Sequence, residues 1–215
     1  MPAETIILVH GLWMTGIEMT MLRHRLEHDH GYNCVQFTYH SVTGEIHDHV
    51  DRLRQLAKEQ QCERLHFIGH SLGGVVTYRV LESTPDLIDG RAVFLGSPLQ
   101  GSAAVDSMSR WTLGRVAIGD AVCKELMGAQ PRHWDGARDI GIIAGSVEMG
   151  IGRLFSDELV SNSDGTVKIE ETKLDGAADS IVLPVTHTSM VFSPLVTAQI
   201  VNFLRDGKFD HTRLS

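Results

Sequence analysis

The part of the sequence best suited to chemistry is residues 69–74, which read Gly-His-Ser-Leu-Gly-Gly. Its serine, Ser71, follows an apolar run at 65–68 that is typical of a strand and precedes one at 75–81 that is typical of a helix. In such a strand–turn–helix the serine is held in a strained backbone conformation, and the glycines let strand and helix approach closely. The pattern predicts a nucleophilic hydroxyl at Ser71, the alternative being a glycine-rich turn that happens to contain a serine.

A serine hydroxyl becomes a strong nucleophile when a histidine takes its proton and a carboxylate orients that histidine. Three histidines follow Ser71 in the chain. His211 lies in a polar tail beyond the last predicted helix, and His133 lies in an irregular segment. His187 lies between the last predicted strand and the last predicted helix, where a loop can reach over Ser71. We therefore predict that His187 is the general base.

The carboxylate partner is predicted to be Asp164. Residues 162–167 read Asn-Ser-Asp-Gly-Thr-Val and open a loop beyond the strand predicted at 140–144, and the Asp-Gly step favours a turn. A plain surface turn is the alternative interpretation of this segment. Asp157 is the next candidate for the acid, whereas Asp139 would lie at the wrong end of its strand.

The elements that must position these residues alternate along the chain. Short apolar runs rich in β-branched residues alternate with longer amphipathic ones, which is typical of βαβ units around a parallel sheet. The pattern predicts six strands, all parallel, with helices between them. The strands are expected at 5–9, 34–39, 65–68, 91–95, 140–144 and 180–185, and the helices at 18–28, 45–60, 75–81 and 194–205.

The length of 215 residues and the hydrophobic content of 42% suffice for one substantial core and are too small for two domains. We expect a single domain over residues 1–215. Residues 98–137 have no clear period and place Met and Trp side chains among glycines and short polar runs, which predicts a small cap or mobile loop over the site. A cap this small favours an open pocket for short or medium acyl chains.

Five segments together resemble small serine hydrolases of the α/β-hydrolase fold, and among these the bacterial lipase and inositol-deacylase-like branch. The resemblance spans nearly the whole chain. Residues 95–102 resemble a threonine/serine-proline-histidine motif of that branch, with Leu99 in place of the usual histidine. The matching segments are Leu8-Val9-His10-Gly11, residues 67–74, residues 95–102, residues 163–167 and the loop at His187.

The resemblance implies a three-layer α/β-hydrolase fold with a minimal cap, in which nucleophile, acid and histidine follow one another along the chain. Ser71, Asp164 and His187 match that order. It also implies hydrolysis of carboxylic esters through an acyl-enzyme, as in a lipase-like carboxylesterase. Neither a metal nor an organic cofactor is expected, because the activated hydroxyl does the chemistry.

The oxyanion that forms during acyl transfer needs two hydrogen-bond donors. The resemblance assigns one to the backbone N–H of Leu72, directly after the nucleophile. The pair His10-Gly11 resembles the His-Gly motif of lipases and esterases, so the N–H of Leu12 is expected to be the second donor. Trp13 and His70 are then expected to flank the substrate pocket.

Other functions fit the same scaffold. A thioesterase would use the same residues, and an acyltransferase would hand the acyl group to an alcohol in a pocket that excludes water. A small-molecule receptor or signalling protein with incidental turnover would also have this sequence pattern. Rates and products distinguish these alternatives from the esterase.

Composition excludes some partners. The formal net charge of −8 disfavours nucleic acid and anionic membrane surfaces, so we expect a small ester substrate and no stable membrane association. Three scattered cysteines and no basic, apolar leader favour a cytoplasmic location. The pairs His28/His30 and His47/His49 are expected on helices, where residues two apart point away from each other, so solvated histidines are expected there and not a zinc site.

Overall fold

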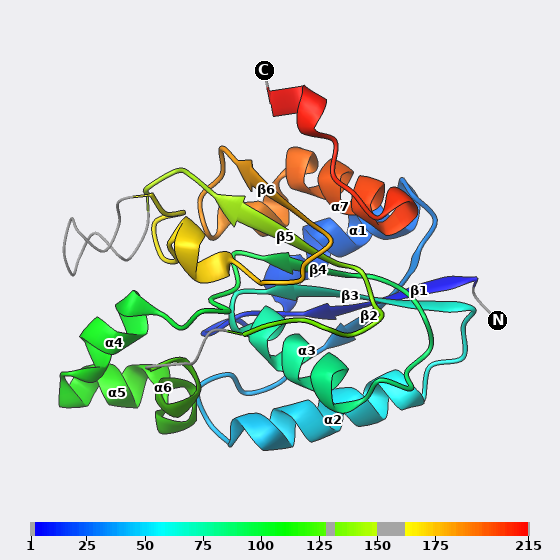
Figure 1. Ribbon diagram of the computed structural model, residues 1–215. Helices are drawn as coiled ribbons and strands as arrows, with labels where there is room; N and C mark the ends of the chain where they lie inside the picture. Colours follow the sequence, from blue (N-terminus) through cyan, green and yellow to red (C-terminus); the bar gives the residue numbers. More distant parts are fainter. Residues whose placement is uncertain (1–2, 128–131, 150–161, 215) are drawn as a thin grey trace.

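The computed structural model describes residues 3–127, 132–149 and 162–214, and Asp157 lies outside them. Its centre is one six-stranded parallel sheet in the order β2-β1-β3-β4-β5-β6 (Figure 1). The prediction of six parallel strands is therefore confirmed. The strands are β1 (Glu4–Val9), β2 (Asn33–Phe37), β3 (Arg64–His70), β4 (Ala92–Leu95), β5 (Ile140–Gly145) and β6 (Asp179–Leu183).

Helices cover both faces of the sheet and make three layers. Figure 1 shows α1 and α7 on one face and α2 and α3 on the other. Each face of the sheet has its own apolar core. Alternate residues of β1 belong to one core or the other, because successive side chains of a strand point to opposite faces. Ile6 and Leu8 pack with the α1/α7 layer, and Ile7 and Val9 with the α2/α3 layer. The helices are α1 (Thr20–His28), α2 (Ile46–Lys58), α3 (Leu72–Ser83) and α7 (Pro194–Asp206).

Residues 98–137 are more regular than the sequence predicts. They contain three short helices, α4 (Ala103–Ser109), α5 (Thr112–Ile118) and α6 (Asp120–Leu126), which lie beyond the sheet at the left of Figure 1. The start of α4 is held by two groups: the hydroxyl of Ser102 accepts from the N–H of Val105, and the Glu171 carboxylate accepts from the N–H of Ala103. Because Glu171 is far from α4 in the sequence, no local sequence pattern predicts this hydrogen bond.

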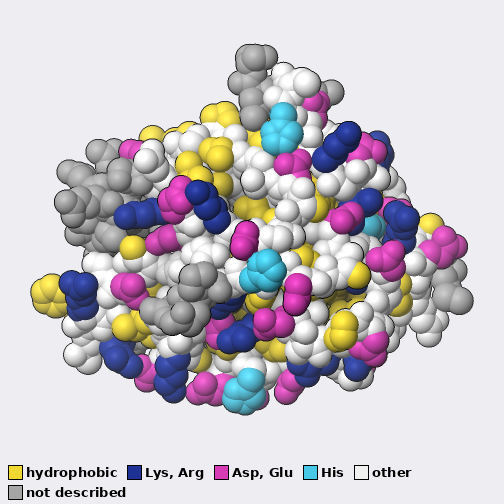
Figure 2. Space-filling model, viewed as in Figure 1, with side chains coloured by type: hydrophobic (Ala, Val, Ile, Leu, Met, Phe, Trp, Pro, Cys, Tyr) yellow, Lys and Arg dark blue, Asp and Glu magenta, His cyan; other side chains and the backbone are white. Residues whose placement is uncertain are grey.

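Four short 3₁₀ helices complete the described elements: η1 (Ile17–Met19), η4 (Ile169–Thr172), η5 (Ser189–Phe192) and η6 (His211–Leu214). In the described part of the chain, no helix has the length and apolar character needed to cross a bilayer. Figure 2 shows acidic and basic side chains interspersed over the visible face, which gives that face no large field of one sign.

The turn between β3 and α3 is packed against its neighbours without spare room. A Cβ on Gly73 would overlap the carbonyl oxygen of Val9, and one on Gly74 would overlap the hydroxyl of Ser97. A Cβ on Gly69 would lie 2.5 Å from the Cα of Gly74. The glycines therefore let α3 start directly against β1 and β4. This close packing fixes the position of Ser71, which lies between Gly69 and Gly73.

Replacing Gly73 by Ala tests this packing. Helix propensity alone predicts that alanine in α3 stabilises the protein by about 1 kcal/mol. The backbone contact with Val9 predicts the reverse, a loss of about 2 kcal/mol or more in the free energy of unfolding, because a packed backbone moves only at a cost. Urea denaturation measures the difference.

Gly31→Ala is the matched control. Gly31 has a φ of 76° but nothing within 4 Å of an added Cβ, so its substitution reports the backbone conformation without crowding. We expect it to cost about 1–2 kcal/mol. A Gly73→Ala protein as stable as the wild type would contradict the packing argument.

Candidate active site

Ser71 stands at the turn between the end of β3 and the start of α3, with φ 54° and ψ −124°. This conformation is strained for a residue with a side chain, at a cost on the order of 1–3 kcal/mol. The turn is held by two backbone bonds: the N–H of Ser71 donates to the carbonyl of Leu95 at 2.9 Å, and the N–H of Gly74 donates to the carbonyl of Ser71 at 3.0 Å. Ser71 lines a cavity of about 350 Å³.

His187 and Asp164 form a close pair beside this cavity. Nδ1 of His187 lies 2.7 Å from Oδ2 of Asp164, whose side chain is 1% exposed. The other oxygen of Asp164 accepts from the N–H groups of Thr166 at 3.0 Å and Val167 at 2.7 Å. The carboxylate is thus fixed from both sides, and a carboxylate at Nδ1 favours the tautomer that carries its proton on Nδ1 and its lone pair on Nε2.

Two glycines that the sequence analysis did not single out make room for this pair. A Cβ on Gly96, which has φ 54°, would lie 2.8 Å from Oδ2 of Asp164 and 3.1 Å from Nδ1 of His187. A Cβ on Gly145 would lie 2.7 Å from Cβ of Asp164. Gly96 directly follows β4 and Gly145 ends β5, so glycine at the carboxyl end of a strand is the signal that would have found them.

His187 is the histidine that the structure brings to Ser71. Both line the same cavity, although the described atoms form no hydrogen bond between them. Such bonds are often long until a substrate is in place. The other candidates are paired elsewhere: His133 lies 3.4 Å from Asp175, and His211 lies 3.1 Å from Asp179 at the start of β6. Asp139, outside the cavity, pairs with Arg91 before β5 begins.

The two predicted oxyanion donors lie near Ser71. A Cβ on Gly11 would come within 2.9 Å of Cβ of Ser71, so the loop after β1 touches the nucleophile. Leu12 and Leu72 line the cavity with it. Among the described residues, neither of their N–H groups donates to a protein acceptor. The N–H of Leu72 also belongs to the first turn of α3, where helix N–H groups have no partner within the helix.

His10 supports the loop after β1 and does not line the cavity. Its side chain is fully buried and stacks on Tyr39, with ring centroids 4.4 Å apart. Nδ1 donates to the carbonyl of Gly11 at 2.9 Å, and Nε2 accepts from the N–H of Tyr39 at 3.2 Å. Burial lowers the pKa of His10, so the ring is neutral, as these two bonds require.

His70 contacts the histidine loop. Its ring is fully buried next to that of His187, with centroids 4.7 Å apart, and Nε2 donates to the carbonyl of His187 at 2.9 Å. Burial, with a smaller contribution from His187, lowers the pKa of His70 to about 3. His70 borders the cavity as expected, but its hydrogen bond gives it the role of a support for the loop.

The cavity has an apolar wall and an exposed aromatic residue at its edge. Trp13 lies at the mouth, 45% exposed, with its indole N–H donating to the carbonyl of Ala117 at 2.7 Å. Leu99, at the position where the motif usually has histidine, is fully buried in the core and does not line the cavity. The apolar wall comes from α4–α6 and consists of Val105, Met108, Ile118, Val122 and Leu126.

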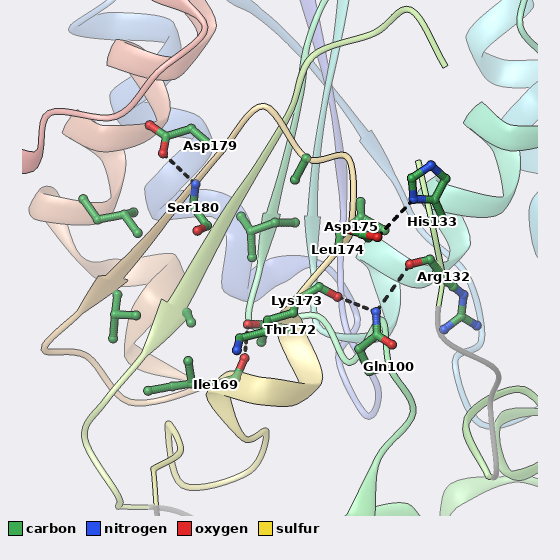
Figure 3. A pocket seen from close by; sticks show the side chains of 15 residues that line it. Gln100, Arg132, His133, Ile169, Thr172, Lys173, Leu174, Asp175, Asp179 and Ser180 are labelled. Carbon is green, nitrogen blue, oxygen red and sulfur yellow. Dashed lines mark hydrogen bonds and ion pairs between the residues drawn. The ribbon is translucent and has the colours of Figure 1, made fainter. Parts of the chain in front are cut away.

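A larger cavity of about 690 Å³ lies over β5 and β6 and is less suited to chemistry (Figure 3). Several of its polar side chains are engaged in bonds with the backbone or with other side chains. Gln100 donates to the carbonyls of Lys173 and Arg132, and His133 faces Asp175. It contains neither Ser71 nor His187, so the smaller cavity is the candidate active site.

The two members of the pair His47/His49 differ in burial. His47 is exposed, as expected, and lies 3.2 Å from Asp48. The expectation is wrong for His49, which is buried at 5% exposure and packs on Tyr39, because the inner side of α2 faces the sheet there. Within the described residues, no three His, Cys, Asp or Glu side chains are grouped closely enough to hold a metal ion.

The sequence model of the alpha/beta hydrolase family matches residues 6–190. No curated protein sequence matches the chain. Solved structures match the fold: a mature lipase of Bacillus licheniformis has a TM-score of 0.69 at 16% identity, covering 95% of this chain and 91% of its own.

Two further structures show the range of proteins on this fold. A metagenomic carboxyl esterase matches with a TM-score of 0.67 at 18% identity, over 88% of this chain and 66% of its own. A bromoperoxidase of Bacillus anthracis matches with a TM-score of 0.65 at 13% identity, over 95% and 92%. At these identities the likeness shows the fold alone, so the chemistry has to be argued from the site.

The buried histidines predict acid sensitivity. The folded protein keeps His70 neutral down to about pH 3, whereas the unfolded chain binds that proton near pH 6.5. The unfolded state therefore holds more protons in this range, and the free energy of unfolding falls as the pH drops below 6.5. In His70→Gln we expect the slope between pH 5 and 6 to be smaller by about 1 kcal/mol per pH unit.

Urea denaturation at several pH values measures this slope. His66→Gln provides a second instance away from the cavity, because burial lowers the pKa of His66 to about 4. It should reduce the slope in the same direction. Slopes identical to that of the wild type in both variants would contradict the prediction.

Proposed function

Because the chain belongs to the alpha/beta hydrolase family, we propose that it is a serine hydrolase that cleaves carboxylic esters through an acyl-enzyme. The observation that carries the proposal is the common cavity of Ser71 and His187, with Asp164 fixed 2.7 Å behind the histidine. The strained turn at Ser71 and the paired carboxylate are costly features that a purely structural loop does not need.

The proposed reaction begins with attack of Ser71 Oγ on the ester carbonyl carbon while Nε2 of His187 takes the hydroxyl proton. Asp164 keeps the Nδ1 proton in place and stabilises the imidazolium that forms. The N–H groups of Leu12 and Leu72 bind the oxygen as it gains negative charge. When the C–O bond breaks, His187 returns the proton to the departing alcohol, and the acyl group stays on Ser71.

Water then completes the cycle. His187 takes a proton from a water molecule, which attacks the acyl carbon, and the carboxylic acid leaves as Ser71 regains its proton. The acyl chain is proposed to lie along the apolar wall from α4–α6. The cavity of about 350 Å³ is at the small end for ligand pockets, which supports short or medium acyl chains.

Covalent labelling tests the nucleophile. Ser71→Ala should abolish labelling by a fluorophosphonate probe while circular dichroism stays that of the wild type, because the probe reacts with an activated serine hydroxyl. Ser83→Ala, at the other end of α3, is the matched control and should be labelled fully. Undiminished labelling of Ser71→Ala would refute the assignment.

The role of Asp164 is tested by its amide. Asp164→Asn should lower kcat by roughly 10³–10⁴-fold with little change in KM, because an amide favours the wrong tautomer of His187 while the pocket stays intact. Steady-state kinetics with p-nitrophenyl butyrate give both constants.

Asp175→Asn removes a carboxylate from another His–Asp pair, in which the Asp175 side chain is 89% exposed, and should keep wild-type kcat. The rival acid is tested in the same assay by Asp157→Asn. If that variant shows the large loss of kcat and Asp164→Asn does not, the acid is Asp157.

A further inference from the structure

Asp164 lies behind His187 and does not line the cavity, so one other residue determines the charge that its described surface presents to a substrate. Apart from its two histidines, the described residues that line the cavity include a single ionisable side chain, Glu18, and no lysine or arginine. Its carboxylate accepts from the N–H of Gly16 at 3.0 Å and from that of Thr15 at 3.3 Å, which fixes it at the start of η1. Glu18 therefore gives the cavity a fixed negative charge that no lysine or arginine among its described lining residues balances.

Glu18 lies on the same side of the cavity as His187. Its element, η1, packs against η5, which begins two residues after His187, and Thr188 between them also lines the cavity. In the proposed reaction His187 hands its proton to the departing alcohol, so the alcohol part of the ester must lie on this side. The apolar wall from α4–α6 is left for the acyl chain.

A carboxylate in a half-enclosed, largely apolar cavity attracts a positive group and repels a negative one more strongly than it would in bulk water. Trp13 lines the same cavity, and aromatic side chains bind cations, quaternary ammonium groups above all. The carboxylate of Glu18 and the indole of Trp13 both favour an alcohol that carries a positive charge.

We infer that the preferred substrates are esters of amino alcohols, with an uncharged, apolar acyl group and a cationic leaving alcohol, and that Glu18 is the residue that selects them. This inference rests on the proposed function, because it uses the leaving-group side defined by His187. The reaction itself is unchanged: the acyl–oxygen bond breaks, and the amino alcohol departs with the proton from His187.

A matched pair of substrates isolates the charge. Butyrylcholine and 3,3-dimethylbutyl butyrate share the acyl group and nearly the same shape, and differ in the positive charge of the alcohol. The wild-type kcat/KM should be higher for the choline ester. In Glu18→Gln the ratio of the two kcat/KM values should fall on the order of fivefold. The glutamine retains an oxygen that can accept from Thr15 and Gly16, so the turn is preserved.

Glu59→Gln is the control for net charge. Glu59, at the end of α2, is outside the cavity and accepts a hydrogen bond from Gln55, so its loss changes the net charge equally and should leave the ratio as in the wild type. The wild-type protein supplies a test without any substitution. Raising the salt concentration should lower the ratio, because salt screens charges that water can reach.

A wild-type ratio of one or less at low salt would overturn the inference, and so would equal ratios in Glu18→Gln and Glu59→Gln. Both results leave ester hydrolysis standing. If the wild type hydrolyses neither ester of the pair nor p-nitrophenyl butyrate, the proposed function fails and the substrate preference fails with it.

Discussion

The close approach of the β3–α3 turn to its neighbouring strands is the constraint on which the rest of the site depends. Glycines at 69, 73 and 74 remove every side chain that would separate α3 from β1 and β4. Ser71 is thereby held in a conformation that costs on the order of 1–3 kcal/mol. The packing of the surrounding core offsets this cost. The packed turn restricts the backbone of Ser71 to this one conformation.

Close packing made possible by glycines also positions Asp164 and His187. Gly96 and Gly145, at the ends of neighbouring strands, let Asp164 and His187 lie against the sheet, and the N–H of His187 donates to the carbonyl of Asp164 at 2.8 Å. His70 ties the same loop to the residue before Ser71. His187, Asp164 and Ser71 are thus connected through backbone groups and the short side chain of His70, which positions them without long, flexible side chains.

Much of this arrangement could be predicted from the sequence, because buried parallel strands have short apolar runs and the elbow places Ser71 by its glycines alone. The prediction of His187 as the base rests on its position between the last strand and the last helix. The prediction of Asp164 in preference to Asp157 cannot rest on local sequence, since it depends on where separate strands end. The start of α4 is held by Glu171, far along the chain. The role proposed for Glu18 depends on the packing of η1 on η5.

The central claim is that the hydrolysed acyl group passes through Ser71. The most direct measurement is peptide mapping by mass spectrometry after the wild-type protein has been mixed with p-nitrophenyl butyrate and quenched in acid during the first turnover. The account predicts one added butyryl group, on the peptide that carries Ser71 and absent from the Ser71→Ala protein. Release of p-nitrophenol with the butyryl group on another residue, or with no acylated peptide at any quench time, would contradict it.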